Sequence, residues 1–234
     1  MALRLEELAK TIDHTLLDPE ATDDDVGRIC DEARQHHFAA VCVLPSHVPR
    51  AREALRGCDV KVSSVIGHPF GGGSLKEKVS TASACVAAGA HELGLVMNLE
   101  AMWRSEFPRV REELAAVVRS VRMLSVNGGR GFVLVKVILE CERLDDKLKQ
   151  LACRIVELVD GDFAETTADA TAGAPQLYDV ELLRERLPER VAVKATGRLE
   201  SLEQAQELVT AGAARLGAPN AVAVLAEARP AVTT

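Results

Sequence analysis

The chain contains 234 residues, of which 47% are hydrophobic, 27% charged and only 3% aromatic, with a formal net charge of −7. This composition is ordinary for a soluble α/β protein with a sizeable core. The negative charge argues against a nucleic acid or an anionic membrane surface as the partner. Six cysteines are scattered without a CxxC pair, and no apolar run approaches the roughly 18 residues of a membrane span. These features predict a reduced, cytoplasmic protein.

Strand-like runs alternate with helix-like runs along the whole chain. In chain order, the expected strands are Thr11–Leu16, Ala39–Leu44, Val60–Ile66, His91–Met97, Phe132–Leu139, Asp162–Glu165, Val191–Lys194 and Ala214–Gly217. Amphipathic stretches between them predict helices such as Asp23–His36, Leu75–Ala88, Pro108–Leu124, Asp145–Leu158, Val180–Arg186 and Leu202–Thr210. Because parallel crossovers are right-handed, these alternating units predict a closed (β/α)8 TIM barrel of the α/β class. An open flavodoxin-like sheet would need only about five or six strands.

Local signals mark several of the expected helix ends. Ser74-Leu-Lys-Glu77 and Ser201-Leu-Glu-Gln204 have capping-box spacing, in which two side chains satisfy backbone amides at a helix start. Gly89 and Gly212 follow two of the helices directly, as a glycine that stops a helix does. These signals support the alternation of elements.

The sequence shows no linker, low-complexity run or domain boundary. We therefore expect one barrel domain over residues 1–234. Residues 1–10 are expected to form a short N-terminal helix and residues 226–234 a C-terminal tail. The loop Gly71–Gly73 is expected to connect a strand to a helix.

Three charged residues interrupt apolar, strand-like runs at equal intervals. Lys136, Glu165 and Lys194 are each 29 residues from the next. Parallel strands covered on both faces are nearly continuous apolar runs, so charges inside them need an explanation. Because this interval matches one strand-plus-helix unit, we expect the three groups at equivalent heights on neighbouring strands. The spacing thus predicts a Lys–Glu–Lys cluster near the strand ends, where α/β folds place their sites.

Seven segments at the expected strand ends form a recognisable series. They are, in order, Asp13-His-Thr-Leu-Leu17 with Pro19, Val41-Cys-Val43 with Pro45, Val65-Ile-Gly-His-Pro69, Val135-Lys-Val-Ile138, the run into Phe163, Val193-Lys-Ala-Thr-Gly197 and Ala211-Gly-Ala-Ala-Arg-Leu-Gly217. In this order and with this spacing, they resemble deoxyribose-phosphate aldolase over almost the full chain. The resemblance implies a (β/α)8 class I aldolase that joins acetaldehyde to glyceraldehyde 3-phosphate through a lysine Schiff base. It also implies that no metal or other cofactor takes part, and that the chain forms a homodimer or larger homo-oligomer.

The chain departs from this family pattern at the catalytic positions. The family's Schiff-base lysine precedes Thr-Ser, whereas this chain reads Phe163-Ala-Glu-Thr-Thr167 and has Glu165 at that place. A carboxylate cannot form an imine, so the family's covalent step is unavailable there. The family's strand-four aspartate is replaced by Gly94. Its second lysine is retained as Lys194 and its strand-five lysine as Lys136.

The loops that bind phosphate in the family are altered as well. Its Gly-Gly after the second lysine is Gly197-Arg198 here, and its Gly-Thr-Ser-Ser-like loop is Gly217-Ala-Pro-Asn220. Pro219 removes an amide donor that a phosphate would use. Arg198 could replace the lost donors by clasping a carboxylate or phosphate, or its side chain could fill the emptied pocket. Ordinary deoxyribose-phosphate aldolase activity is therefore not expected.

The substitutions favour acid–base chemistry without an imine on a small carbonyl or polyhydroxylated substrate. Two ammonium groups are expected to hold Glu165 ionised, as a base, while Lys194 and Lys136 stabilise an enolate or other developing anion. Asp13 would orient a substrate hydroxyl. Carbon–carbon cleavage, enolisation, cyclisation and dehydration all fit this scheme. An ion pair at about 4 Å is worth roughly 4 kcal/mol at an effective dielectric near 20, which opposes deprotonation of a lysine. An imine moved to Lys194 or Lys136 nevertheless stays open as an alternative.

The remaining expected substrate-binding residues lie in the same strand ends and loops: Arg198, Gly197, Thr166, Thr167, Gly217, Asn220 and Cys42. Cys42 also fits a small inward-facing core residue. A metal-dependent aldolase would need converging ligands such as His14 and His68, but HxH and HExxH spacing is absent and no metal is expected. The alternative from another class is an inactive barrel with a binding or regulatory role, in which the charged cluster is a relic.

Overall fold

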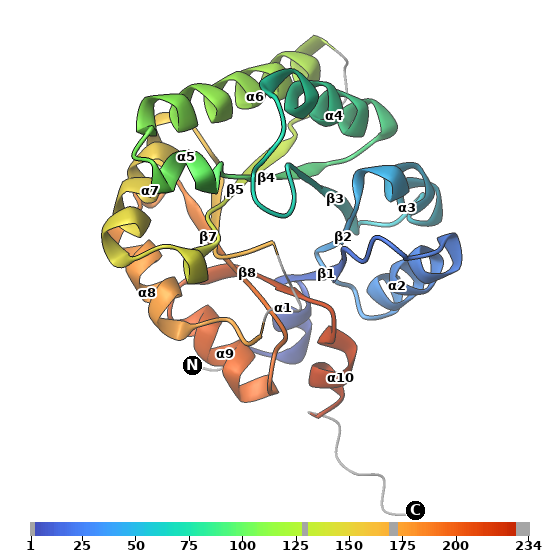
Figure 1. Cartoon of the computed structure of the whole chain (residues 1–234). Helices are drawn as coiled ribbons and strands as arrows, with labels where there is room; N and C mark the ends of the chain where they lie inside the picture. The colour runs from blue at the N-terminus through green and yellow to red at the C-terminus, as the bar shows by residue number, and fades with distance from the viewer. Residues whose placement is uncertain (1–2, 128–130, 169–172, 228–234) are drawn as a thin grey trace, which may run out of the picture.

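The computed structural model describes residues 3–127, 131–168 and 173–227, and it contains one closed barrel of eight parallel strands. The strands pair in chain order from β1 to β8, and β8 closes the ring against β1. Figure 1 shows the strands surrounded by a ring of helices. The (β/α)8 fold predicted from the alternation of elements is therefore confirmed.

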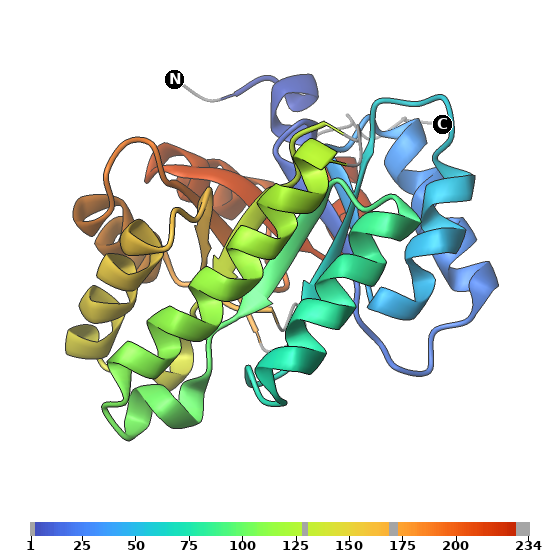
Figure 2. The same cartoon turned by 90° about the horizontal axis from the view of Figure 1, so that it is seen from above.

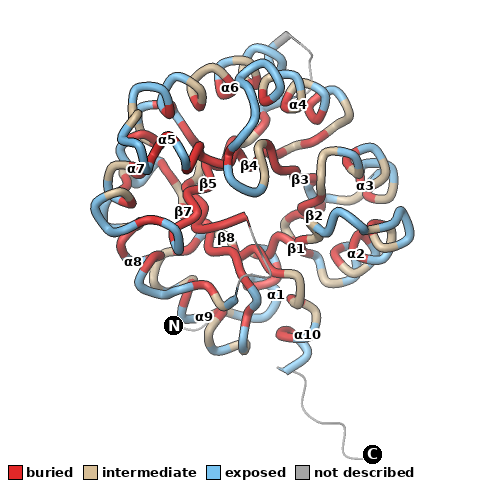
Figure 3. The backbone as a smooth tube through the Cα atoms, in the orientation of Figure 1, coloured by how far each residue is buried: buried red, intermediate tan, exposed pale blue. Residues whose placement is uncertain are grey.

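All eight expected strands are present, with ends shifted by at most two residues. They are β1 (Ile12–Leu16), β2 (Ala40–Val43), β3 (Lys61–Ile66), β4 (Glu92–Val96), β5 (Leu134–Ile138), β6 (Phe163–Glu165), β7 (Ala192–Thr196) and β8 (Ala213–Ala218). Most strand residues are buried, because one face points into the barrel and the other packs against the helices. Figure 3 shows this burial along the ring of strands.

Ten α-helices and two short 3₁₀ turns connect or flank the strands in the described part of the chain. The helices are α1 (Leu5–Ala9), α2 (Asp23–Gln35), α3 (Val48–Ala54), α4 (Leu75–Ala88), α5 (Leu99–Trp103), α6 (Phe107–Asn127), α7 (Asp146–Leu158), α8 (Leu177–Arg186), α9 (Leu202–Thr210) and α10 (Ala221–Ala226). The 3₁₀ turns are η1 (Pro45–His47) and η2 (Cys141–Arg143). Seen from the side, α4 and α6 run along the outside of the barrel, while α1 lies at the end where β1 begins (Figure 2). No described helix has the length and apolar character that crossing a membrane requires.

The helix-end signals are confirmed in one case and corrected in another. Ser74 and Glu77 form a complete capping box at the start of α4, and Gly89 ends that helix with φ of 103°. Ser201 does cap α9 by accepting a hydrogen bond from the Gln204 amide. The Gln204 side chain, however, accepts from the amide of Glu200 instead of returning to Ser201, so the predicted reciprocal box is wrong.

The expected loop Gly71–Gly73 does connect β3 to α4. Gly71 has φ of 70°, and a Cβ atom there would collide with the carbonyl group of Met97. Only glycine allows this close approach of the loop to the end of β4. The structure describes the chain up to residue 227, so residues 228–234 of the predicted tail 226–234 lie outside the described residues.

Candidate active site

A carboxylate and an ammonium group meet inside the barrel where β6 and β7 end. Glu165 and Lys194 are register partners on these strands, and Lys194 Nζ lies 2.8 Å from Glu165 Oε1. Thr196, two residues further along β7, donates a hydrogen bond of 2.7 Å from Oγ1 to the same oxygen. Glu165 is only 3% exposed and Lys194 only 1%. The Glu–Lys part of the expected cluster is therefore present.

Lys136 and Lys194 lie at the same level, because their Nζ atoms contact the same carboxylate oxygen, Asp13 Oδ2. Among the described residues, however, no ion pair joins Lys136 to Glu165, so the expectation that Glu165 lies between the two lysines is wrong. The register partner of Lys136 on β6 is Phe163, whereas Glu165 pairs with Ile138. The register between neighbouring barrel strands, not the length of each crossover, decides which of these side chains meet.

Asp13, instead of Glu165, is the carboxylate between the two lysines. Its Oδ2 atom lies 2.6 Å from Lys136 Nζ and 3.0 Å from Lys194 Nζ. Its Oδ1 atom accepts hydrogen bonds from the guanidinium of Arg215, including one of 2.8 Å from Nε. Asp13 has no exposed surface, and both of its oxygens are bonded to cations. Asp13 therefore holds the two lysines and Arg215 in place below the mouth of the barrel.

Two members of this network, Glu92 on β4 and Arg215 on β8, were not predicted from the sequence. Glu92 Oε2 lies 2.5 Å from Lys136 Nζ and 3.3 Å from Arg215 Nη2. Both residues interrupt expected strands, so the rule that singled out Lys136 would also have found them. Three carboxylates thus face three cations, and the buried charges balance within the network.

The network changes the proton affinity of its members in opposite directions. Burial alone works against the charged form of Lys194, but the carboxylates of Asp13 and Glu165 outweigh burial and raise the pKa of this lysine. Burial likewise opposes ionisation of Asp13. The surrounding Lys136, Lys194 and Arg215 nevertheless hold the pKa of Asp13 well below its usual range. Lys194 is consequently an ammonium group and Asp13 a carboxylate at neutral pH.

Among the described residues, Lys194 and Glu165 leave one donor and one acceptor for a ligand. An ammonium group has three N–H donors, and Lys194 directs two of them to Glu165 and Asp13. Within the described residues, Glu165 uses Oε1 for both of its polar contacts, and Oε2 accepts no hydrogen bond. A carboxylate oxygen and an N–H group therefore remain next to each other at the end of β6 and β7.

Gly217 on β8 makes room for this arrangement. A Cβ atom at Gly217 would lie 2.9 Å from Lys194 Cε and would also overlap the Thr196 hydroxyl. Both neighbours are fixed by their bonds to Glu165. The absence of a side chain at this expected substrate-binding position thus lets β7 carry two polar groups side by side.

We expect the variant Gly217→Ala to lower the free energy of unfolding by about 1–3 kcal/mol, because the added methyl group overpacks the barrel against Lys194 and Thr196. Denaturant titration checks this value. The matched control is Gly72→Ala, since a Cβ atom at Gly72 would meet no atom within 4 Å. Equal stability of the two variants would contradict the packing described for Gly217.

Of the other expected binding residues, several bond to the protein itself. Thr166 accepts a hydrogen bond from the Thr196 amide through its hydroxyl, and Asn220 bonds to the backbone of Leu199. The amide of Gly197 donates to the carbonyl of Gly217 at 2.9 Å. Arg198 is exposed on the loop that follows β7. These residues surround the mouth of the barrel, and no described ion pair joins any of them to the charged network.

A small apolar cluster also lies on the inward-facing ends of the strands. It comprises Cys42, Val65, Val96, Ile138 and Ala168, with Leu17 and Leu44 against it. Burial raises the pKa of the Cys42 thiol to about 11, so this cysteine is neutral and unsuited to act as a nucleophile. The cluster gives the upper part of the barrel an apolar wall.

Glu140, directly after β5, holds the loop that follows β6. This buried residue has φ of 58°, and its carboxylate accepts hydrogen bonds of 2.7 Å from Thr167 Oγ1 and 2.9 Å from the Ala168 amide. Burial raises the pKa of Glu140, and the nearby Glu165 carboxylate adds to this effect. The sequence analysis missed Glu140; an acidic residue at a strand end beside the cluster was the available signal.

His14 does not point into the barrel. Its ring nitrogens lie 2.6 Å from Glu32 Oε2 and 3.2 Å from the carbonyl oxygen of Ala218, so it ties β1 to α2 and β8. Among the described residues, no three histidine, cysteine or acidic side chains are grouped as metal ligands.

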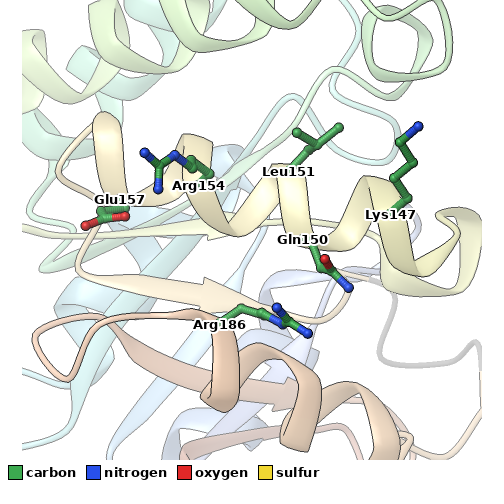
Figure 4. Close-up of a pocket in the computed structure, with 6 residues that line it drawn as sticks. All are labelled: Lys147, Gln150, Leu151, Arg154, Glu157 and Arg186. Atoms are coloured by element: carbon green, nitrogen blue, oxygen red, sulfur yellow. The ribbon is translucent and has the colours of Figure 1, made fainter.

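A surface groove between α7 and α8 is separate from the barrel interior (Figure 4). It is lined by Lys147, Gln150, Leu151, Arg154 and Glu157 of α7 and by Arg186 of α8. None of these residues belongs to the charged network, so the groove is not an entrance to it.

Comparison with known proteins identifies relatives of this barrel. Known protein-family models give no match to the chain. A deoxyribose-phosphate aldolase of Caldanaerobacter subterraneus subsp. tengcongensis is 38% identical over 223 residues, covering 95% of this chain and 94% of that protein. One from Clostridium tetani is 36% identical, covering 95% and 100%.

Among solved structures, the tetrameric deoxyribose-phosphate aldolase of Aeropyrum pernix superposes with a TM-score of 0.84 at 31% identity, covering 95% of this chain and 91% of that one. The identity, the coverage and the shared barrel agree with the resemblance of the strand-end segments. On these grounds the chain belongs to the deoxyribose-phosphate aldolase family.

Proposed function

We propose that the protein is an aldolase-like lyase that acts on a small carbonyl compound by proton transfer, without a Schiff base at Glu165. The observation that carries this proposal is the ion pair between Glu165 and a protonated Lys194 at the end of β6 and β7. A carboxylate stands where the family resemblance expects the imine lysine, and its neighbour is held in the charged form.

In the proposed reaction, Glu165 Oε2 removes a proton and the free N–H of Lys194 stabilises the resulting oxyanion. For enolisation, the proton leaves the carbon next to the carbonyl, and the C–H electron pair forms the C=C bond while the carbonyl oxygen takes the negative charge. For retro-aldol cleavage, the proton leaves the β-hydroxyl and the C–C bond breaks to the same enolate. Thr196 keeps the carboxylate in place, since it donates to Oε1.

An imine at Lys194 remains the nearest alternative. It requires a neutral amine, and the raised pKa of Lys194 beside Asp13 and Glu165 opposes that state. Lys136 is fully buried, and its Nζ atom contacts Asp13 and Glu92, so it is not placed to attack a carbonyl compound at the mouth of the barrel. The proton-transfer scheme uses Lys194 in the charged form that its surroundings favour.

A non-catalytic binding barrel is the second candidate, and the low exposure of Glu165 and Lys194 favours it. A network whose charges are already balanced can persist without a substrate. Such a protein would turn over none of the carbonyl compounds that fit the barrel.

Solvent-deuterium exchange distinguishes these functions. We expect the protein to incorporate deuterium at the α-carbon of glyceraldehyde or dihydroxyacetone, and Glu165→Gln to lose about 10²–10⁴-fold of this rate. The glutamine side chain has the same size as glutamate and can still accept the hydrogen bond from Thr196 Oγ1, but it is not a base. Borohydride treatment with the same compounds should leave the mass of the protein unchanged. A reduced adduct that disappears in Lys194→Ala would favour the imine, and exchange unaffected by Glu165→Gln would refute the proposal.

The tetrameric assembly named for the Aeropyrum pernix relative supports a homo-oligomer for this protein as well. The family resemblance of the sequence also implied a homodimer or larger homo-oligomer. Light scattering at several protein concentrations separates a monomer, dimer and tetramer.

A further inference from the structure

Three loops at the mouth of the barrel bring two aromatic rings and a guanidinium group together. Phe70 lies in the loop that follows β3, Trp103 ends α5 after β4, and Arg143 ends η2 after β5. These three strands are neighbours in the barrel. Their carboxyl ends form the face on which (β/α)8 barrels place their sites. We call the three residues the aromatic–arginine patch.

Contacts between the loops hold the aromatic–arginine patch together. Trp103 Nε1 donates a hydrogen bond of 3.1 Å to the carbonyl oxygen of Arg143. The amide of Leu99, at the start of α5, donates one of 3.3 Å to the carbonyl oxygen of Phe70. Arg143 Cζ lies 4.7 Å from the centroid of the Phe70 ring. The patch is therefore one surface built from three loops.

Both rings of the patch are exposed, although the chain contains few aromatic residues. Only 3% of its residues are aromatic, and Trp103 is its single tryptophan. Phe70 is 51% exposed and Trp103 is 54% exposed. Because both residues contact Arg143, they are not scattered surface side chains. Exposed apolar groups that gather beside a polar group are typical of a binding surface.

The guanidinium group of Arg143 has donors to offer an anion. It is exposed and carries five N–H donors, none of which has a hydrogen-bond acceptor or a carboxylate partner among the described residues. The face of the Phe70 ring attracts this cation and holds it in place. A guanidinium group that is held in this way suits a carboxylate, which it can bind through two parallel hydrogen bonds.

The turn that carries Arg143 is fixed against the strand end that carries Glu165. The amide of Cys141, the first residue of η2, donates a hydrogen bond of 2.8 Å to the carbonyl oxygen of Thr166, which follows Glu165. Burial raises the pKa of Glu140, the Glu165 carboxylate adds to this effect, and the positive charge of Arg143 opposes it. The charges of Arg143 and Glu165 thus act on the same carboxyl group, and the patch adjoins the candidate active site.

We infer that Arg143 binds a carboxylate of the substrate at the aromatic–arginine patch, so that the substrate is a small oxo acid whose carbonyl group is presented to Glu165 and Lys194. The substrate class rests on the proposed function, whereas carboxylate binding is a property of the patch itself. A carboxylate fits better than a phosphate for two reasons. A single planar guanidinium group matches a planar monoanion, and a protein with a formal net charge of −7 repels a dianion more strongly.

The fluorescence of Trp103 tests this site, because no other tryptophan contributes to it. Titration with 2-oxobutanoate, 4-oxopentanoate and 5-oxohexanoate should change the emission in a saturable way for at least one of them. The corresponding amides, which have the same size and no charge, should cause no saturable change. In Arg143→Gln the Kd of the bound oxo acid should rise at least about tenfold, because the charge-assisted hydrogen bonds are lost.

The matched control is Arg104→Gln. Arg104 follows Trp103 directly and is also exposed, but it pairs with Glu100 at 2.7 Å. This variant removes the same charge and should leave the Kd unchanged. If Arg143→Gln does not fold, Arg143→Lys carries the test, since it keeps the charge and loses the planar fork, and its Kd should also rise.

Three results would overturn the inference. They are an equal rise of the Kd in Arg143→Gln and Arg104→Gln, a wild-type protein that binds none of the oxo acids, and tighter binding of methyl phosphate than of any oxo acid in the same titration.

Turnover separates this inference from the proposed function. Deuterium exchange into the bound oxo acid should be faster than exchange into its amide, and Arg143→Gln should raise KM for the oxo acid more than it lowers kcat. Binding of the oxo acid without any exchange would refute the proposed function and leave the carboxylate site standing. Equal exchange into the oxo acid and its amide would refute the substrate class and leave the proposed function standing.

Discussion

Replacing Asp13 with asparagine should lower the free energy of unfolding by about 3–5 kcal/mol, because it leaves buried cations without their counter-charge. Asp13 accepts from Lys136, Lys194 and Arg215 and has no exposed surface. Asparagine keeps the shape of the side chain, so the loss of stability would come from the missing charge and not from a cavity. Urea denaturation at pH 7 measures the difference.

The same variant should change the dependence of stability on pH. The fold depresses the pKa of Asp13, so the stabilisation is complete above the unfolded value of about 3.9 and is lost as the pH falls toward the lower folded value. The difference between the wild type and Asp13→Asn should therefore narrow below about pH 4. The control Asp24→Asn removes an exposed carboxylate that has no ion partner among the described residues. Similar losses in both variants would show that the network does not depend on Asp13.

Replacing Glu165 with lysine should let the protein form an imine that the wild type does not form. The introduced amine would lie beside Lys194, which is 2.8 Å from Glu165 Oε1. The network would then hold more cations than carboxylates, and the repulsion lowers the pKa of the amine until it loses its proton. Borohydride reduction with acetaldehyde should give one adduct per chain in Glu165→Lys and none in the wild type, as measured by intact mass.

The control for this experiment is Glu165→Met, which removes the carboxylate without adding an amine and should give no adduct. In Glu165→Lys/Lys194→Met, the second cation is missing, so the pKa of the introduced amine should stay higher and the adduct should form more slowly. A folded Glu165→Lys protein without any adduct would show that small aldehydes do not reach the end of β6. This outcome would favour the non-catalytic candidate.

Adding Gly94→Asp to Glu165→Lys would restore the family's strand-four aspartate, but the new side chain needs space that Ile138 occupies. A Cβ atom at Gly94 would lie 2.8 Å from Ile138 Cδ1. The methyl end of Ile138 must move before an aspartate fits. The double variant therefore tests repacking of the apolar wall as well as chemistry.

Strand and helix identities followed from the sequence because hydrophobic periodicity is a local property. The runs at Leu75–Ala88 and Leu202–Thr210 became α4 and α9 with the expected bounds. The family resemblance also followed from local segments, such as Asp13–Leu17, and the relatives confirm it. Charged residues inside strands pointed correctly to a buried polar site at Glu165 and Lys194.

The sequence by itself therefore determined the barrel and its family, and it predicted that Glu165 replaces the imine lysine. Only the tertiary structure decided that Asp13, and not Glu165, lies between the two lysines, because strand register depends on contacts all around the closed sheet. It also decided that the Glu227 carboxylate accepts a hydrogen bond from the amide of Leu202, the first residue of α9. These partners are far apart in the chain, and no local pattern encodes their distance.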